Sequence, residues 1–541
     1  MSERSGRSAR LAAWLALAPF AAAGAQYALT KSMHQDVAYY VNAVERWLGG
    51  ARLYRDMIDV NVPTVYWVMA APVWIAQRLG LPSTLVFNLF VLALAALSAA
   101  AVWRLARRAV AGASLVPDAA AGALLIWCAA LVGHDFGQRE HLATILLAPY
   151  AAARAAAGRE PGSSGLRILI GLCAGLGLAL KPYFVLIVLG MEGALLLRRG
   201  RAWRPSIETA ALALSAGACA AATIVLVPDY MDRILPLARA TYHGFEWPLA
   251  TMLGAQGPRT FGCFALALLA LPLAWRVERR TGDLAAVLAG GALGGFASFL
   301  IQSKGWLYQL TPALTYATAA FAMVAVALAE SWISSWRDRW RASAAVGLCL
   351  AAMAAVLALE LGRLFRSDAA LQQRQAPVLE AVRDYARGGG PALFISIEVD
   401  YTFPAVNYAG ASYPYRWHHL LPMPGFYRGF RPGPSGQPFR APGEMGPLER
   451  GFFETFIEDA IAHPPRLVLV DRRRLVRPGL APELDLLAYF CQSPRFAELL
   501  AEYGWLGRRG SYDVLVPLPS DPPTGGACAT PAPHPEGDPS S

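Results

Sequence analysis

Long apolar stretches alternate with short polar segments through most of the first 362 residues. A helix needs roughly 20 apolar residues to cross about 30 Å of hydrocarbon. The apolar stretches predict eleven membrane-spanning helices, the first over residues 11–30 and the last over 342–362. The others are predicted at residues 84–106, 117–133, 140–157, 166–181, 183–198, 206–228, 260–275, 283–302 and 305–330. At Lys181-Pro182 a single kinked helix is the alternative to two spans.

Arginines gather in the connections on one side of this predicted bundle. The clusters are Arg4/Arg7/Arg10, Arg104/Arg107/Arg108, Arg154/Arg159/Arg167, Arg198/Arg199/Arg201/Arg204, Arg276/Arg279/Arg280 and Arg337/Arg339/Arg341. Cytoplasmic connections of membrane proteins carry an excess of Lys and Arg, so the N-terminus is predicted in the cytoplasm and the C-terminus outside. The outer side then takes residues 30–83, 134–139, 229–259, 303–304 and everything after 363.

The first apolar run has a second interpretation. Its basic start and the small residues at 21–25 also fit a cleavable signal peptide. The run is long for the apolar part of a signal peptide, so we interpret it as a retained first span.

Two amphipathic segments lie in the first outer loop, residues 30–83. Residues 36–48 place their apolar side chains on one helical stripe, and residues 63–79 begin with Pro63, which suits a first helical turn. Both segments are short and rich in aromatic residues, as are helices that lie in the membrane interface. We therefore predict two interfacial juxtamembrane helices here and no additional span.

Beyond residue 370 the long apolar stretches end and short strand-like runs appear. The predicted elements are a helix at 370–386 and strands at 391–399, 466–471 and 511–516. Residues 401–450 are rich in Pro, Gly and aromatic residues and give few regular signals. These features predict a small α/β domain on the extracytoplasmic side.

The predicted fold class is mainly α, a polytopic helical bundle with a small C-terminal domain. Its predicted parts are a transmembrane module over residues 1–365, an extracytoplasmic α/β domain over 366–517 and a tail over 518–541. The tail is rich in Pro, Gly and Ser and is predicted to be disordered.

Charge and cysteine content exclude two kinds of function. The formal net charge of +10 arises from the loop clusters and lacks aromatic–basic interleaving, so nucleic-acid binding is not expected. The seven cysteines form no CxxC or Cys/His cluster, which argues against a cysteine-based metal site. A Cys491–Cys528 disulfide stays open if the C-terminal part is periplasmic.

Ionisable and aromatic side chains gather at the predicted outer ends of the spans. Ionisable groups are costly at membrane depth, so their placement is informative. The first outer loop contributes His34, Asp36, Glu45, Arg55, Asp56 and Asp59. The later connections contribute His134, Asp135, Gln138, Arg139, Glu140, His141, Lys181, Gln302, Lys304, Trp306 and Tyr308. Because these groups face one side in the predicted topology, we expect them to surround one cavity at the outer leaflet.

This inventory of side chains suits one type of reaction. A carboxylate can act as the general base that activates a hydroxyl or an amine. Lys and Arg can stabilise the negative charge that develops on a leaving lipid phosphate. Aromatic and apolar walls suit a polyprenyl tail and the faces of sugar rings.

The first outer loop also carries a series of short motifs. They are Asp36, Tyr39-Tyr40, Trp47-Leu48-Gly49-Gly50, Leu53-Tyr54-Arg55-Asp56, Val62-Pro63-Thr64-Val65-Tyr66-Trp67 and Leu79-Gly80. This series resembles the first outer loop of GT-C superfamily glycosyltransferases. It is most similar to the glycosyltransferase family 39-like branch that contains protein O-mannosyltransferases and the lipid A aminoarabinose transferase.

The resemblance extends over most of the first 310 residues. It includes Gly137-Gln138-Arg139-Glu140-His141 and the segment from Gln302 to Tyr308. One departure is that family members begin the second loop helix with two prolines, whereas Val62 precedes Pro63 here. The first-loop motifs indicate the superfamily but give little information about the substrate.

The resemblance implies transfer of a sugar from a polyprenyl-phosphate donor on the periplasmic face of a bacterial inner membrane. The acceptor is expected to be an envelope glycan, lipid or protein. Asp36 corresponds to the family's catalytic base or acceptor-orienting carboxylate, and the second acidic position corresponds to Glu140 or Asp135. The predicted donor-phosphate contacts are Lys181, Lys304, Arg139 and Arg55. The predicted substrate-binding residues are Tyr39, Tyr40, His141, Gln302, Trp306 and Tyr308.

Each of these roles has a structural alternative. Asp36 could cap the helix that follows it, and Glu140 with Arg139 could form an interfacial ion pair. The lysines could extend to lipid headgroups, and the aromatic residues could belong to an interfacial belt. His134 and His141 lack a recognised third metal ligand; no cofactor is predicted, and a divalent cation stays open.

Two other functions compete with glycosyl transfer. A transporter or lipid flippase predicts ionisable groups at mid-span and interrupted helices. Glu192 is one of the few acidic residues predicted within a span. A non-catalytic envelope-assembly protein would leave Asp36 dispensable.

Overall fold

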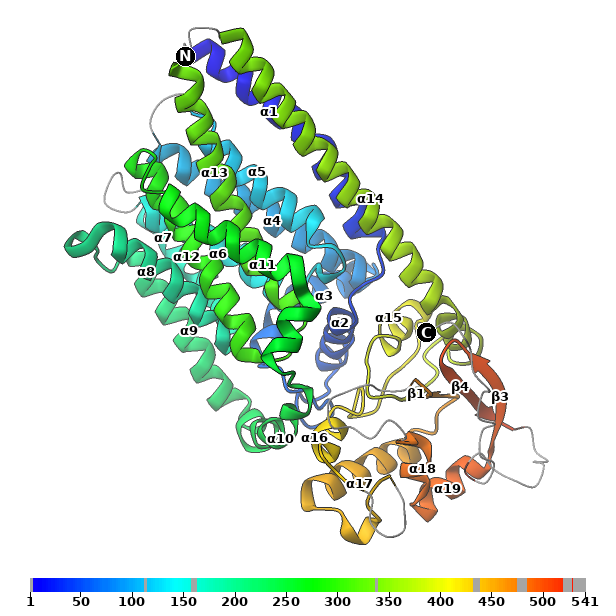
Figure 1. The fold of residues 1–541 in the computed structure, drawn as a ribbon. Coiled ribbons are helices and arrows are strands. Elements are labelled where there is room, and N and C mark those ends of the chain that lie inside the picture. The colour runs from blue at the N-terminus through cyan, green and yellow to red at the C-terminus, as the bar shows by residue number, and fades with distance from the viewer. Residues whose placement is uncertain are drawn as a thin grey trace. The chain divides into compact units, whose positions relative to one another are not determined.

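The computed structural model describes residues 3–110, 114–156, 163–335, 339–431, 438–473, 484–518 and 528. The chain forms two compact units (Figure 1). Unit 1 comprises Met1–Glu45, Asn61–Pro228 and Glu246–Ala370. Unit 2 comprises Arg46–Val60, Asp229–Phe245 and Leu371–Ser541. Unit 2 therefore includes two segments from predicted outer loops as well as the C-terminal region.

Helices in the positions of all the predicted spans confirm the mainly α class. They are α1 (Glu3–Thr30), α4 (Ser83–Ala109), α5 (Val116–Ile126) continued by the π-helical η1 (Trp127–Leu131), α6 (Arg139–Ala156), α7 (Ser164–Ala179), α8 (Val185–Arg199), α9 (Ile207–Leu226), α11 (Leu249–Leu273), α12 (Arg279–Gln302), α13 (Thr311–Ser335) and α14 (Arg339–Tyr385). Among the described residues, five helices are long and apolar enough to cross a membrane on that basis alone. They are Ser8–Thr30, Ser83–Ala109, Ile207–Leu226, Arg279–Gln302 and Leu307–Ile333. The count of eleven spans stays a prediction.

The helical conformation is interrupted between α7 and α8, so this region forms two helices and not one kinked helix. Lys181 has extended dihedral angles, with φ −161° and ψ 130°. Proline disfavours a helical conformation in the residue before it, which explains the break. A short turn, η3 (Pro182–Phe184), then leads into α8.

The two amphipathic segments of the first loop are helices, as predicted. They form α2 (Gln35–Leu48) and α3 (Thr64–Leu79). Pro63 precedes α3, and Gly80 ends it with a left-handed φ of 63° that lets its backbone N–H reach the carbonyls of Ala76 and Gln77. Their position in a membrane interface stays a prediction.

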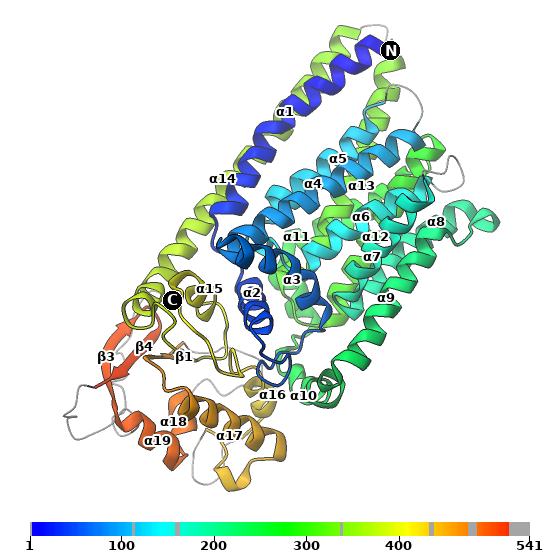
Figure 2. The same ribbon diagram turned by 180° about the vertical axis from the view of Figure 1, so that it is seen from behind.

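Small residues allow the helices of unit 1 to pack closely. A Cβ on Gly190 of α8 would overlap the carbonyl oxygen of Gly290 on α12, and one on Gly294 would overlap that of Leu186. Close approach through small residues is typical of helix pairs in membranes. At another face of the unit, α1 lies alongside the first part of α14 (Figures 1 and 2), with the rings of Tyr27 and Phe365 5.1 Å apart.

Gly190→Val should lower the unfolding free energy by about 1–3 kcal/mol, because overpacking strains a closely packed interface. Gly193→Val is a matched control on the same helix, since a Cβ there meets no neighbouring heavy atom within 4 Å among the described residues. Thermal unfolding in detergent, followed by size exclusion, measures both variants. Equal melting temperatures would contradict the close α8–α12 contact.

Acidic side chains inside the bundle pair with arginines of the predicted cytoplasmic clusters. The pairs are Arg154–Glu192 (2.6 Å), Arg167–Glu208 (2.6 Å), Arg198–Asp283 (2.9 Å) and Arg199–Asp283 (3.0 Å). Buried ions are tolerated when a partner and further hydrogen bonds compensate them. Glu192 also accepts a hydrogen bond from the indole of Trp203 at 2.9 Å. Glu192 of α8 therefore links this helix to Arg154 of α6.

Unit 2 contains a four-stranded mixed sheet in the order β1-β2-β4-β3. The strands are β1 (Ala392–Ile395), β2 (Leu467–Asp471), β3 (Tyr503–Arg509) and β4 (Tyr512–Pro517). β1 pairs with β2 in parallel, with Ala392 opposite Leu467, and β4 pairs with β2 and β3 in antiparallel. All residues of β1 and β2 are buried. The sheet confirms the predicted small C-terminal α/β region.

Several elements of unit 2 differ from the predictions. β1 is shorter than the predicted strand at 391–399, because Ser396 Oγ donates to Glu398 O at 2.9 Å and accepts from its N–H at 3.1 Å. β3 was not predicted, since it is an edge strand with glycines and a bulge between Trp505 and Gly507. The predicted helix at 370–386 is the end of α14 and not a separate helix.

Further helices were also missed in unit 2. They are η5 (Tyr230–Ile234), α10 (Leu235–Thr241), η6 (Tyr242–Phe245), α15 (Thr402–Ala409), α16 (Met423–Tyr427), α17 (Pro447–Ala462), α18 (Leu486–Cys491) and α19 (Pro494–Ala501). Aromatic packing joins some of them, as Phe456 of α17 stacks on Phe490 of α18 at 4.0 Å. Cys491 forms a disulfide with Cys528. Apart from Leu518 and Cys528, the tail predicted to be disordered lies outside the described residues.

Candidate functional site

Four chain segments of unit 1 bring predicted site residues together. They are the start of α2, the turn η2 (Gly133–Asp135) with the start of α6, the connection between α7 and η3, and the turn η7 (Leu307–Leu310). Their contacts link Asp36 to Gln138, Glu140 to Lys181, and Tyr308 to both His34 and Lys181. Polar side chains from distant parts of the sequence thus form one connected group.

Asp36 lies in the first turn of α2 and is half-buried. Its Oδ2 accepts a hydrogen bond from Gln138 Nε2 at 2.9 Å, and its backbone N–H donates to His34 Nδ1 at 3.1 Å. Burial, together with the charges of Lys31 and Arg139, lowers the pKa of His34 to about 3. His34 is therefore neutral near pH 7, so its Nδ1 can accept this bond. The N-terminus of a helix also favours a carboxylate.

Glu140 and Lys181 form a buried ion pair. The Lys181 Nζ lies 2.8 Å from Glu140 Oε1, and the two side chains are 12% and 1% exposed. Glu140 Oε2 is also buried but accepts no hydrogen bond from the residues that the structure describes. Buried polar atoms nearly always have a partner, so this oxygen is available to a donor on a ligand.

Arg139 does not pair with Glu140, which was the structural alternative. One of its terminal nitrogens donates to Asn61 Oδ1, and its guanidinium lies 5.8 Å from the ring centre of Tyr40. Tyr40 in turn packs edge-on against Tyr66 of α3. Arg139 therefore joins the start of α6 to the two helices of the first loop.

The connection between α12 and η7 contributes a cation and two aromatic rings. Lys304 is buried, and its Nζ lies 3.6 Å from Glu246 Oε1. The rings of Trp306 and Tyr308 stack at 5.7 Å. Tyr308 also lies 5.8 Å from the Lys181 Nζ and 5.9 Å from the His34 ring. Through Tyr308 this connection reaches the group around Asp36 and Glu140.

Two predicted substrate-binding residues make contacts that stabilise the fold. Gln302 donates to Ser298 O at 2.9 Å and accepts from Gln309 Nε2 at 2.9 Å, which joins the end of α12 to η7. His141 Nδ1 accepts from the backbone N–H of Gly137 at 3.0 Å. Gly137 has a φ of 84°, a conformation that glycine adopts readily, and so forms the turn before α6.

His134 and Asp135 of η2 lie beside His34, which belongs to the group around Asp36. The rings of His34 and His134 are 4.9 Å apart, and Asp135 Oδ1 lies 3.9 Å from His34 Nε2. In the part of the chain that the structure describes, no three His, Cys, Asp or Glu side chains are arranged to hold a metal ion. His134 and His141 thus have no third ligand among those residues.

One predicted site residue, Arg55, lies in unit 2, and two neighbours of the group in unit 1 were missed. Arg55 is part of unit 2, where it pairs with Asp229 at 2.7 Å. Lys31 is buried and donates to Ser32 O at 3.1 Å, and Asp368 accepts from the Ser32 N–H at 3.0 Å. Lys31 was missed because it directly follows an apolar run, a position from which lysine side chains commonly extend to lipid headgroups. Asp368 carries no local signal, because it reaches this place only through folding.

Sequence comparison identifies no relative. No protein-family model matches the chain, and no curated protein matches it. Structural comparison finds the crystal structure of ArnT from Cupriavidus metallidurans bound to undecaprenyl phosphate, with 13% identity and a TM-score of 0.52. The alignment covers 96% of this chain and 99% of that one.

The apo structure of the same protein gives a similar result. It has 12% identity and a TM-score of 0.53 over 93% of this chain and 97% of that one. Similarity at this level of identity establishes the fold. The chain therefore has the ArnT-like GT-C fold, as the motifs of its first outer loop predicted.

Proposed function

We propose that the chain is a bacterial inner-membrane glycosyltransferase that moves a sugar from a polyprenyl-phosphate donor to an envelope acceptor on the periplasmic face. The observation that carries the proposal is the convergence of Asp36, Gln138, Glu140 and Lys181 in unit 1. This group occurs in a chain with the fold of ArnT, a structure of which holds undecaprenyl phosphate.

Asp36 is the proposed base. As the acceptor's oxygen or nitrogen attacks the anomeric carbon, its proton passes to the carboxylate of Asp36 and the bond between sugar and phosphate breaks. Polyprenyl phosphate leaves with the bonding electrons. The hydrogen bond from Gln138 holds the carboxylate in a defined orientation, and its partial exposure leaves room for an acceptor. A positioned base typically accelerates such a step by about 10²–10⁴-fold.

Lys181 is the proposed contact for the leaving phosphate, with Arg139 and Lys304 as further cations. Preorganised cations lower the energy of the charge that develops on the phosphate. Glu140 positions Lys181, and its free oxygen can receive a hydroxyl of the sugar or of the acceptor. Trp306, which is half-buried, is the aromatic side chain proposed to contact the substrates, whereas Tyr39, Tyr40 and Tyr308 are buried.

A sequence pattern supports a periplasmic active side, and a disulfide supports a periplasmic location for unit 2. The arginine clusters lie at the opposite ends of the predicted spans from Asp36, Glu140 and Lys304. Unit 2 carries the Cys491–Cys528 disulfide, and disulfides persist in oxidising compartments such as the periplasm.

The test uses purified full-length chain in nanodiscs with undecaprenyl-phosphate donors that carry different radiolabelled sugars. Envelope extract, separated into glycan, lipid and protein fractions, supplies the acceptor. Radiolabel is expected to enter one fraction in the presence of one donor and of the chain. If every donor stays intact with every fraction, the proposal fails. If the donor instead crosses the membrane of a sealed vesicle that contains the chain, and stays intact, the chain is a transporter.

A further inference from the structure

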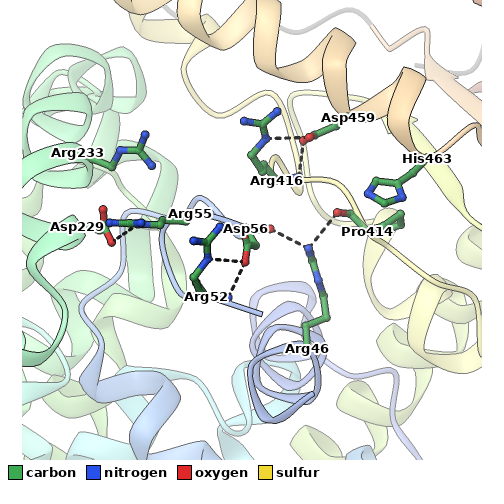
Figure 3. Close-up of a pocket in the computed structure, with 10 residues that line it drawn as sticks. All are labelled: Arg46, Arg52, Arg55, Asp56, Asp229, Arg233, Pro414, Arg416, Asp459 and His463. Atoms are coloured by element: carbon green, nitrogen blue, oxygen red, sulfur yellow. Dashed lines mark hydrogen bonds and ion pairs between the residues drawn. The ribbon is translucent and has the colours of Figure 1, made fainter. Parts of the chain in front are cut away.

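A cavity of about 830 Å³ lies in unit 2 and is lined mainly by charged side chains (Figure 3). Five arginines contribute to its wall: Arg46, Arg52, Arg55, Arg233 and Arg416. They come from all three segments of unit 2, and we call the pocket that they line the arginine cavity. The proposed transfer reaction uses none of the side chains that line this cavity.

Two of the arginines are fixed by hydrogen bonds. Arg46 donates to the backbone carbonyls of Tyr415, Pro414 and Asp56 at 3.1, 3.0 and 2.8 Å. The Arg416 Nε lies 2.8 Å from Asp459 Oδ1, and its backbone N–H donates to Asp459 Oδ2 at 2.7 Å. Their guanidinium groups therefore keep defined positions in the wall.

The other three arginines are available to an incoming anion. Arg52 pairs with Asp56 at 3.1 Å, with side chains 64% and 36% exposed, and Arg55 pairs with Asp229 at 2.7 Å, with 48% and 20%. Exposed ion pairs contribute only about 0–1 kcal/mol, so an incoming anion can replace the aspartate. Arg233 is exposed and forms no ion pair with a described residue. Figure 3 shows it on the same side as Asp229.

The turn that carries Arg52 and Arg55 is itself fixed. Tyr54 has a φ of 66°, which is uncommon for a residue other than glycine, and its N–H donates to Met57 O at 2.9 Å. Its side chain is buried and packs against Tyr230, with ring centres 5.3 Å apart. Uncommon backbone conformations persist where the surroundings enforce them, often at binding sites. The buried ring anchors the turn, and the two neighbouring arginines face the cavity.

The charge of the wall selects the ligand. Among the residues that line the cavity, five arginines face three aspartates (Asp56, Asp229 and Asp459), which leaves an excess of two positive charges in the lining. Glu458, which is not part of the lining, also pairs with Arg416 at 3.0 Å. A phosphomonoester carries about −1.5 to −2 charges at pH 7, whereas a carboxylate carries only one. Its three terminal oxygens can accept from several guanidinium groups at once. The volume lies within the roughly 300–1,000 Å³ of small-molecule sites, so a sugar-sized group fits beside the phosphate.

We propose that the arginine cavity binds a phosphomonoester carried by a small polar group, either a free phosphorylated sugar or a lipid headgroup. An entering phosphate displaces Asp56 and Asp229 from Arg52 and Arg55 and is also contacted by Arg233. Arg46 and Arg416 form the fixed part of the site. This binding does not depend on the proposed glycosyl transfer.

The test measures retention of radiolabelled glucose 6-phosphate by the full-length chain in phosphatidylcholine nanodiscs. The double variant Arg52→Ala/Arg233→Ala should bind about ten-fold more weakly, because it removes two phosphate contacts from exposed positions. The control is Arg383→Ala/Arg387→Ala, which removes the same charge from exposed positions of unit 2 outside the cavity. It should change binding less than about two-fold.

Competition identifies the source of the phosphate. Phosphatidic acid in the nanodisc should displace the label if the ligand is a lipid headgroup, and only soluble phosphomonoesters should displace it if the ligand is free. Either result supports the site. Absence of binding, equal weakening by the two double variants, or equal displacement by acetate at the same ionic strength would overturn it.

Discussion

Asp36→Asn should lower the rate of sugar transfer by at least about 10²-fold, because the amide cannot take the acceptor's proton. Asparagine has nearly the same size and can still accept the hydrogen bond from Gln138, so the fold is expected to persist. Binding of undecaprenyl phosphate should stay within about three-fold, since the leaving group is assigned to cations and not to Asp36. Single-turnover transfer in nanodiscs, together with lipid binding, measures both quantities.

This substitution separates catalysis from helix capping. Asparagine caps helices about as well as aspartate, so a capping role predicts a nearly unchanged rate. Asp384→Asn is the matched control, because Asp384 is exposed on α14 in unit 2. If Asp36→Asn and Asp384→Asn transferred sugar at the same rate, Asp36 would not be the base.

Glu140→Leu should destabilise the protein by about 3–5 kcal/mol, because it leaves the ammonium of Lys181 buried without its partner. The double variant Glu140→Leu/Lys181→Met should recover most of that loss, since apolar side chains of similar size can replace a buried ion pair. Transfer should stay low in the double variant, because the cation assigned to the leaving phosphate is missing. Thermal unfolding in detergent and single-turnover transfer provide the two readouts.

An exposed ion pair in the same unit serves as the control. Glu360 and Arg363 of α14 lie 3.0 Å apart and are 47% and 50% exposed, so Glu360→Leu should change stability by less than about 1 kcal/mol. Recovery of both stability and transfer in the Glu140→Leu/Lys181→Met variant would show that the pair only supports the fold.

The helices of unit 1 could be predicted because membrane helices have one dominant signal, a long apolar run. The break at Lys181-Pro182 follows from the local effect of proline. Unit 2 was harder to predict, since its elements are short and depend on tertiary contacts. β3 is an edge strand without alternating apolar residues, and α14 continues through a polar region that looked like a separate helix.

The composition of the candidate site was predictable, but its pairing was not. Sidedness alone grouped Asp36, Glu140, Lys181 and Tyr308, and contacts in unit 1 connect them through Gln138 and His34. The partners were set by folding. Glu140 pairs with Lys181, which is 41 residues away. It does not pair with the adjacent Arg139, because side chains of successive residues on a helix point in different directions.

The position of Arg55 shows the same limit. Its motif placed it with the donor-phosphate contacts of the first loop. The segment Arg46–Val60 folds with the C-terminal region, where the Ile58 N–H donates to Arg416 O at 2.8 Å. No local pattern indicates the contact between Ile58 and Arg416, because these two residues are far apart in the sequence. Arg55 consequently contributes to the arginine cavity.

Glycosyl transfer by this chain is tested most directly by the ratio of its two products. Wild-type chain in nanodiscs is incubated with the sugar-bearing undecaprenyl-phosphate donor and the accepting envelope fraction. Mass spectrometry then counts undecaprenyl phosphate released and sugar attached. We expect one molecule of undecaprenyl phosphate for each sugar transferred, and neither product with Asp36→Asn. Sugar on the acceptor without matching release of undecaprenyl phosphate, or equal product from Asp36→Asn, would contradict the proposed reaction.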